Sequence, residues 1–244
     1  ATGSLRLPAR SDLPLVLSVG VFQMLAFTVL GSMAMKEVSA GRSAILAYTT
    51  PLWVTPAALL FGGERPSPRQ IVGTGLGILG VLVLVNPMTL DWQQTHVLRA
   101  NLMLLAAALC WALCIIHLRH HRNGAAAYQL APWQMLVATV PLMAGARWVE
   151  GPYNGDGSPA FWATVLFVGV VATAFCFCAV NSASKWLSST SMASAMLAVP
   201  VVGLLVSVLF LGEKMTVVLA IGLAAIIAGM ATAVMGPAPA HQAR

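Results

Sequence analysis

Long apolar stretches separated by short polar segments run through the whole chain. The uncharged stretches cover residues 13–35, 43–63, 70–90, 100–118, 123–146, 157–184, 186–212 and those from 215 onward. Each comes close to the roughly 20 residues with which an α-helix crosses a bilayer. The stretches are apolar nearly all round, unlike the two-faced pattern of soluble helices or the alternation of strands. The pattern predicts an all-α polytopic membrane protein with eight transmembrane helices.

Composition agrees with this prediction and excludes several function classes. Of the 244 residues, 59% are hydrophobic and only 8% are charged, whereas a soluble domain has roughly 25% charged residues. The net charge of +6 comes from basic residues that lie singly between apolar stretches. We therefore expect the lipid bilayer and a small-molecule substrate as partners, and no nucleic acid. No nucleotide-binding or hydrolytic motif occurs, so we expect neither an enzyme nor a cofactor.

Two groups of potential metal ligands have simpler interpretations. The four cysteines, Cys110, Cys114, Cys176 and Cys178, lie within apolar stretches and lack CxxC spacing, which favours core packing. His117, His120 and His121 have the spacing of a helical metal site, but Arg119 and Arg122 lie among them. A basic cluster at the membrane surface is favoured over a metal site, so no metal is expected.

An internal repeat appears when the sequence is shifted against itself by 149 residues. The shift aligns Gly20 with Gly169, Lys36 with Lys185, Pro51 with Pro200, Glu64 with Glu213, Gly73 with Gly222 and Gly80 with Gly229. Corresponding helices are five apart, so they cross the membrane in opposite directions, as in the inverted repeats of secondary transporters. Helices at 100–118 and 132–148 have counterparts only before residue 1. We expect a ten-helix inverted-repeat (5+5) fold lacking its first two helices here; an eight-helix protein is the alternative.

Both copies of the repeat carry a proline inside an apolar stretch, followed by a glutamate. Pro51 and Pro200 remove a backbone N–H, so each predicts a helix kink that lines a pathway, with simple packing as the alternative. Glu64 and Glu213 precede Ser67 and Thr216, which suit helix N-caps, so each carboxylate is expected near the positive end of the next helix. That role is structural; a proton-coupling carboxylate is the alternative.

The candidate substrate pathway is neutral. No Asp, Glu, Lys or Arg lies in the middle of an apolar stretch, which argues against a proton relay through buried charges. Neutral side chains remain that could contact a solute, although each could equally bond to a neighbouring helix: Gln23, Tyr48, Thr50, Trp111, Thr173, Phe177, Asn181 and Ser194. No catalytic residue is expected.

Gly73, Gly77 and Gly80 share one face of a helix and permit a close approach by another helix. We expect that approach within the chain. A homodimer contact through this face is the alternative.

These residues resemble the EamA family of the drug/metabolite transporter superfamily. The resemblance rests on Pro51-Leu with Gly63-Glu64-Arg65 in one half, and on Pro200-Val-Val-Gly with Leu211-Gly-Glu-Lys214 in the other. Trp111-Ala112 and Trp133-Gln134 add to it. It implies a cytoplasmic segment at 1–12, the last three helices of a first EamA repeat at 13–90, a connecting loop at 91–99, a second five-helix repeat at 100–236 and a tail at 237–244.

The expected function is that of a secondary transporter. The resemblance, the inverted repeat and the neutral pathway predict an exporter of small amphipathic metabolites, such as amino acids or drugs, that works by alternating access. The alternative is a truncated, non-transporting membrane protein or an assembly partner. The location expected is the bacterial inner membrane. The resemblance implies that both termini are cytoplasmic. The Lys and Arg count, eight inside against five outside, favours the same orientation.

Overall fold

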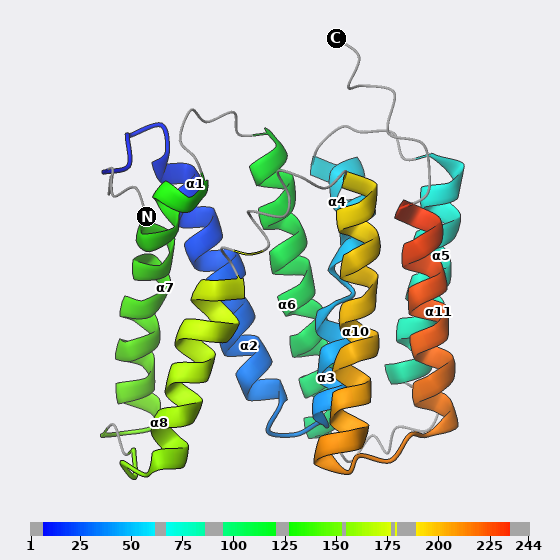
Figure 1. Ribbon diagram of the computed structural model, residues 1–244. Helices are drawn as coiled ribbons and strands as arrows, with labels where there is room; N and C mark the ends of the chain where they lie inside the picture. The colour runs from blue at the N-terminus through cyan, green and yellow to red at the C-terminus, as the bar shows by residue number, and fades with distance from the viewer. Residues whose placement is uncertain are drawn as a thin grey trace.

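The computed structural model describes residues 7–61, 67–85, 95–120, 127–152, 155–176, 179 and 189–234. Every regular element among them is a helix, and the helices lie side by side along one common direction (Figure 1). In chain order they are α1 (Leu13–Ser18), η1 (Val19–Ala26), α2 (Phe27–Ala34), α3 (Ala40–Ala47), α4 (Thr50–Phe61), α5 (Pro68–Val85), α6 (Thr95–His120), α7 (Ala127–Val149), α8 (Pro159–Leu166), η2 (Phe167–Phe175), α10 (Ser189–Leu211) and α11 (Val217–Val234). The all-α prediction is confirmed for this part of the chain.

Each predicted apolar stretch contains at least one described helix. Two of them, Leu13–Ala34 and Thr95–Leu118, are long and apolar enough to cross a bilayer, and four shorter apolar helices accompany them in the described ranges. The number of crossings stays a prediction. One boundary differs from expectation: α6 begins at Thr95, so residues 95–99, assigned to the connecting loop, are helical. The charges of that segment marked the end of the apolar stretch, but a helix continues beyond its apolar part.

The stretch predicted at 43–63 is divided into α3 and α4 by a turn at Tyr48 and Thr49. Pro51 has no N–H to donate to the carbonyl of Ala47, four residues earlier. The hydroxyl of Thr50 donates to that carbonyl instead, at 3.3 Å, and the hydroxyl of Thr49 donates to the carbonyl of Leu46 at 2.7 Å. Neighbouring hydroxyls therefore satisfy the carbonyls at the break, as the inside of a membrane requires.

The proline that corresponds to Pro51 lies in a different local structure. Pro200 is buried inside α10, which continues through it without interruption. Pro51 instead stands at the start of α4, directly after the turn, and its side chain is outside the described set. The two prolines therefore share a sequence position but not a helix geometry.

Helices α5 and α11 make the closest contact in the described structure, and glycines make it possible. A Cβ added to Gly73 would lie 2.5 Å from the nitrogen of Ala233 and 2.6 Å from the oxygen of Gly229. A Cβ added to Gly80 would lie 2.8 Å from the nitrogen of Ile226 and 2.9 Å from the oxygen of Gly222. Backbone therefore packs on backbone along this pair. The predicted glycine face is covered within the chain, as expected; a homodimer is not tested by this contact.

Two apolar clusters hold most of the described helices together. The larger joins α3, α4, α5, α6, α10 and α11 around fully buried side chains such as Leu46, Leu84 and Ile226. The smaller joins α1 and η1 to α6 and α7 through Leu15, Val16, Val19, Cys114 and Leu130. Helix α6 contributes to both clusters and lies between α2, α3 and α4. It therefore connects the two parts of the bundle.

We predict that Gly73→Ala lowers the thermal stability of the purified protein in detergent. The new Cβ would collide with backbone atoms of α11, which cannot move aside as a flexible side chain can, and overpacking of this kind costs about 1–3 kcal/mol. The control is Gly75→Ala on the same helix, where nothing lies within 4 Å. It should be neutral or slightly stabilising, because alanine is the better helix former. Equal melting temperatures for both variants would contradict the close contact.

Candidate functional site

Three aromatic side chains, two from helices and one from a turn, pack together. The rings of Phe27 and Trp111 pack edge to face, with centroids 4.9 Å apart and planes at 86°. The ring of Tyr48 lies 6.3 Å from that of Trp111, tilted by 52°. Phe27 comes from the start of α2, Trp111 from α6, and Tyr48 from the turn between α3 and α4. All three are partly exposed, so this aromatic cluster can contact a solute.

An amide and a thiol extend the aromatic cluster by one helical turn. The thiol of Cys114 donates to Oε1 of Gln23, with Sγ and Oε1 3.6 Å apart. Cys114 lies three residues after Trp111 on α6, and Gln23 lies four residues before Phe27, within the π-helix η1. The amide N–H groups of Gln23 have no described partner, and the side chain is half-buried. This edge of the aromatic cluster therefore offers hydrogen-bond donors without a formal charge.

The structure brings some of the predicted pathway residues together and separates others. Gln23, Tyr48 and Trp111 join in the aromatic cluster, and Thr50 is buried beside it, with its hydroxyl held by the carbonyl of Ala47. Thr173 is exposed on η2, where its hydroxyl donates to the carbonyl of Val168 at 2.8 Å. Phe177 and Asn181 lie outside the described residues. Ser194 lies in α10, but its side chain is outside the described set.

The sequence interpretation missed Phe27 and Cys114. Both are apolar residues within apolar stretches, so composition gives no signal for them. Their spacing does give one, because Phe27 lies four residues after Gln23 and Cys114 three residues after Trp111. Residues at those spacings share a helix face. Each therefore extends a helix face that carries a candidate pathway residue, Gln23 or Trp111.

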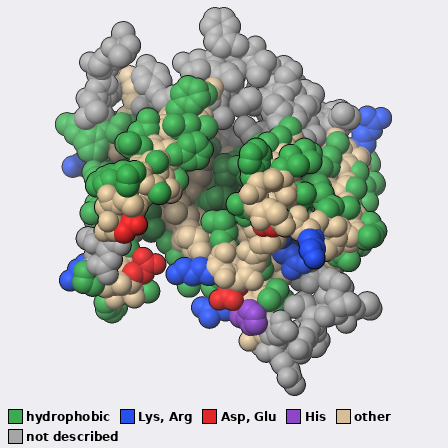
Figure 2. Space-filling model, turned by 60° about the horizontal axis from the view of Figure 1, so that its bottom comes forward, with side chains coloured by type: hydrophobic (Ala, Val, Ile, Leu, Met, Phe, Trp, Pro, Cys, Tyr) green, Lys and Arg blue, Asp and Glu red, His purple; other side chains and the backbone are tan. Residues whose placement is uncertain are grey.

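The lower end of the bundle carries most of the described charged side chains. Seen from that end, the surface is hollowed between the side with α7 and α8 and the side with α10 and α11, and apolar side chains flank the hollow (Figure 2). Lys36 and Glu150 form an ion pair there, with Nζ and Oε1 3.7 Å apart. Both side chains are about two-thirds exposed, so the pair contributes little to stability.

Glu213 lies at this lower end and binds the first turn of a helix distant in sequence. Its Oε1 accepts from the backbone N–H of Ala40 at 2.7 Å, and its Oε2 accepts from that of Gly41 at 3.1 Å. These donors open α3, not the following helix α11, where the sequence placed the carboxylate. The structural role is of the expected kind, because unpaired N–H groups at a helix start attract an anion. Glu64 lies outside the described residues.

The environment of Glu213 favours its ionised form. Desolvation raises the pKa of this carboxyl, but the side chains of Ser207 and Ser39 and the backbone N–H groups of Gly41 and Ala40 lower it more. The net pKa is below its ordinary value of 4.5. A carboxylate that stays ionised at neutral pH fits a helix cap better than a group that must pick up and release protons during transport.

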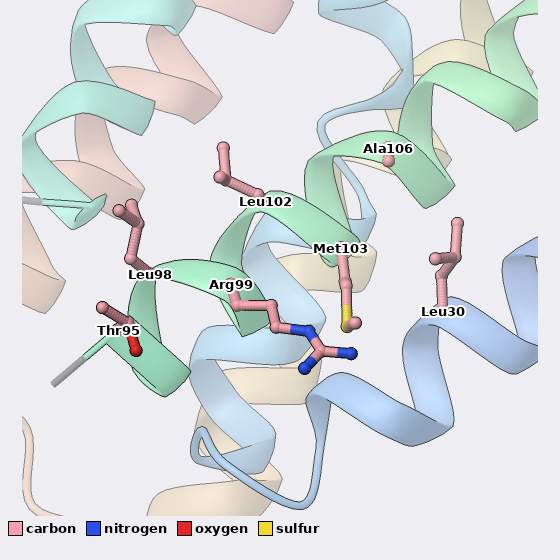
Figure 3. Close-up of a pocket in the computed structure, with 7 residues that line it drawn as sticks. All are labelled: Leu30, Thr95, Leu98, Arg99, Leu102, Met103 and Ala106. Carbon is pink, nitrogen blue, oxygen red and sulfur yellow. The ribbon is translucent and has the colours of Figure 1, made fainter.

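A separate apolar groove of about 350 Å³ lies on the outer surface between α2 and α6. Leu30 lines it from α2, and Thr95, Leu98, Arg99, Leu102, Met103 and Ala106 line it from α6. Figure 3 shows the Arg99 side chain extending across the mouth of the groove towards α2. None of the residues of the aromatic cluster lines it. The groove and the aromatic cluster are therefore separate features of α6.

The comparisons with known proteins decide the family. The model of the EamA-like transporter family matches residues 3–86 and 98–235. This chain belongs to the EamA-like transporter family. It is therefore an integral membrane protein of a transporter family, not an enzyme family, and its assignment to the drug/metabolite transporter superfamily is confirmed.

Relatives and a solved structure agree with this assignment. A probable amino-acid metabolite efflux pump of Salmonella typhimurium is 27% identical over 240 residues, which are 93% of this chain and 79% of that protein. A probable terminal-alkyne amino-acid exporter of Streptantibioticus cattleyicolor is 27% identical over 227 residues, covering 92% and 74%. One crystal structure shares the fold with a TM-score of 0.63 at 21% identity, covering 94% of this chain and 77% of that one.

We predict that Glu213→Gln removes an acid-dependent part of the stability. Because folding lowers the pKa of this carboxyl, the stability that it contributes is present above its ordinary value of 4.5 and is lost as the pH falls through the lowered value. The wild type should lose thermal stability in detergent as the pH falls from the ordinary pKa of 4.5 through the lowered value, and Glu213→Gln should start lower and change less. Glu150→Gln, which alters an exposed side chain, is the control. Parallel pH curves for wild type and Glu213→Gln would contradict the capping role.

Proposed function

We propose that this protein is a secondary transporter that exports small amphipathic metabolites, such as amino acids, by alternating access. The observation that carries the proposal is the neutral aromatic cluster of Phe27, Tyr48 and Trp111, extended by Gln23, in a helix bundle of a transporter family. Two relatives are named as exporters of amino acids or their metabolites, which supports the substrate class.

The chemistry of the aromatic cluster suits a small zwitterion with an apolar side chain. Aromatic faces attract an ammonium group and also pack against hydrocarbon. The N–H groups of the Gln23 amide, which have no partner among the described residues, can donate to a carboxylate. Neither interaction leaves a fixed charge in the membrane after the substrate departs, so the empty site has no uncompensated ion to stabilise.

Corresponding positions of the two halves support an inverted repeat. Adding 149 to the bounds of α5 gives 217–234, the bounds of α11, and adding it to the first residue of α3 gives 189, the first residue of α10. The π-helical segments also correspond, at 19–26 and 167–175. The contact of Gly80 with Gly222 becomes that of Gly229 with Gly73 under the same shift. A two-fold relation between the halves accounts for all of these agreements.

Alternating access in such a protein is a rocking of the two halves about the α5 and α11 pair. The turn at Tyr48 and Thr49 supplies a flexible point beside the aromatic cluster, and the π-helix η1 supplies a second. In the proposed orientation, the cytoplasm of a bacterial cell contacts both termini and the segments 64–69 and 119–122. The lower end in Figure 1 faces outward. The coupling ion is not specified by this proposal.

We predict that Trp111→Ala lowers transport while leaving the amount of folded protein in the membrane close to normal. The assay is export of labelled amino acids from loaded proteoliposomes, with empty vesicles as the baseline. Loss of the central ring removes the packing of both Phe27 and Tyr48, and we expect at least a tenfold loss of rate, the factor that about 1.4 kcal/mol represents. Trp148→Ala is the matched control, because Trp148 is 90% exposed.

One outcome would count against the transporter and another against the role of the aromatic cluster. Wild-type protein that never exceeds empty vesicles across an amino-acid and metabolite panel would favour a non-transporting membrane protein or an assembly partner. Equal losses for Trp111→Ala and Trp148→Ala would leave the transporter in place but remove the aromatic cluster from its pathway. Tyr48→Phe keeps the ring and removes only the hydroxyl, so it separates packing from hydrogen bonding.

We predict that Pro51→Ala and Pro200→Ala reach the membrane at near-normal levels but lose transport, with the double variant most affected. At position 51 a restored N–H would compete with the Thr50 hydroxyl for the carbonyl of Ala47 and join α3 to α4 across the turn. At position 200 it would tighten a buried turn of α10. Rates are measured per folded molecule in proteoliposomes.

The glutamates of the repeat serve as the comparison. Glu64→Gln and Glu213→Gln should lower folded yield more than the rate per folded molecule, because helix capping is a structural role. Normal transport by the proline variants, together with a well-folded but inactive glutamate variant, would replace the kink hypothesis with coupling through a carboxylate.

A further inference from the structure

The apolar groove between α2 and α6 opens on the face of α6 that points away from the bundle. Ala100, Leu104 and Ala107 form the buried face of this helix and are 1%, 1% and 0% exposed. Leu102, which lines the groove, is 54% exposed. Two residues along a helix correspond to a rotation of about 200°, so Leu102 lies opposite Leu104. In an integral membrane protein the groove therefore opens towards lipid.

One charged side chain crosses the mouth of this groove. Arg99 is the only Lys, Arg, Asp or Glu between Thr95 and Leu118, the part of α6 that is apolar enough to cross a bilayer. Its guanidinium extends towards α2 (Figure 3) and forms no ion pair with a carboxylate of the described residues. A cation at membrane depth is costly without a counter-ion. Arg99 therefore lacks a partner that the protein does not supply in its described part.

The depth of Arg99 matches that of lipid phosphates. It follows the first residue of α6 by four positions, which is about 6 Å along the helix axis. Headgroups occupy the outer layers of the bilayer, on either side of the hydrocarbon core. A guanidinium near the end of a membrane-crossing helix can reach that layer, because long basic side chains extend towards the interface.

The groove is long and narrow. Its lining on α6 runs from Thr95 to Ala106, about 16 Å along the helix axis, and its volume is about 350 Å³. An α-helix about 10 Å wide that filled this length would need three turns and about 1,300 Å³. The space is therefore too small for a protein helix, whereas a hydrocarbon chain is thin enough to lie in it.

We propose that the groove binds one acyl chain of an anionic phospholipid whose phosphate pairs with Arg99. The chain lies along Leu98, Leu102 and Ala106, parallel to the helices, and the phosphate lies at the mouth. The guanidinium can donate two parallel hydrogen bonds to phosphate oxygens. The hydroxyl of Thr95, one helical turn before Arg99, lines the same end of the groove and provides another donor.

A lipid at this site would connect two helices of the aromatic cluster. Leu30 lines the groove from α2, three residues after Phe27, whose ring packs edge to face on Trp111 of α6. A ligand that binds the folded protein and not the unfolded chain raises its stability. The anionic lipid should therefore raise the melting temperature as well as bind.

The first experiment measures the charge preference. Wild-type protein in detergent is titrated with phosphatidylglycerol or with phosphatidylcholine of the same chains, and native mass spectrometry counts the bound lipids. We expect one phosphatidylglycerol to bind at least tenfold more tightly than phosphatidylcholine. Arg99→Gln should lose this preference. Arg147→Gln is the matched control, because Arg147 is an exposed arginine at the end of α7 and does not line the groove.

The second experiment fills the groove. Ala106→Trp places a ring where the acyl chain would lie and should weaken the binding of both lipids at least tenfold. Ala144→Trp, at an exposed position of α7 outside the groove, is the control. Melting temperatures of all variants without lipid identify any variant that is misfolded. Phosphatidylglycerol should raise the melting temperature of wild type and both controls, and not that of Arg99→Gln or Ala106→Trp.

Other occupants of the groove give different results. Equal affinity of wild type for the two lipids, or equal preference in Arg99→Gln and Arg147→Gln, would overturn the pairing of phosphate with Arg99. Competition by inorganic phosphate at the lipid concentration, with no effect of Ala106→Trp, would indicate a free-anion site and overturn the role of the groove. A species with the mass of two chains that Ala106→Trp abolishes would identify a second copy as the occupant instead.

Discussion

The backbone contact between α5 and α11 is the constraint on which the rest of the bundle depends. Between helices in a membrane there is little hydrophobic drive, so close van der Waals contact must hold them together. Gly73, Gly80, Gly222 and Gly229 permit that contact because none carries a Cβ. Helix α4 packs on both members of the pair, and α10 packs on α11 and on α3. These contacts of α4 and α10 with the pair therefore fix the position of the turn that carries Tyr48.

Neutral and charged side chains occupy different places in the bundle. The aromatic cluster and the Gln23 amide can orient a bound solute, and burying these neutral groups carries a modest desolvation cost. Glu213 lies at a helix end, where the N–H groups of Ala40 and Gly41 compensate its charge. That bond also fastens the loop between α10 and α11 to the start of α3. The carboxylate of Glu213 therefore has a structural role, whereas neutral groups form the aromatic cluster.

The comparison of the two halves is informative because their sequences correspond while their surroundings differ. Leu13–Ala34 is enclosed by α6 and α7, whereas α8 and η2 are exposed throughout. Yet both carry a π-helical segment and a glycine at the same place.

The sequence by itself determined the helices, the family and the glycine face. Apolar length is a local property, since a helix satisfies its own backbone bonds, and glycine spacing fixes which face can approach a neighbour. Tertiary structure decided the rest. The stretch with Pro51 is interrupted at Tyr48, where the hydroxyls of Thr49 and Thr50 donate to the carbonyls of Leu46 and Ala47. The stretch with Pro200 forms one continuous helix. Tertiary structure directed Glu213 to α3 instead of α11, and it joined Gln23, Tyr48 and Trp111 while leaving Thr173 exposed. These outcomes depend on which helices lie next to each other, and a repeat of apolar stretches leaves that choice open because lipid and protein are equally apolar neighbours.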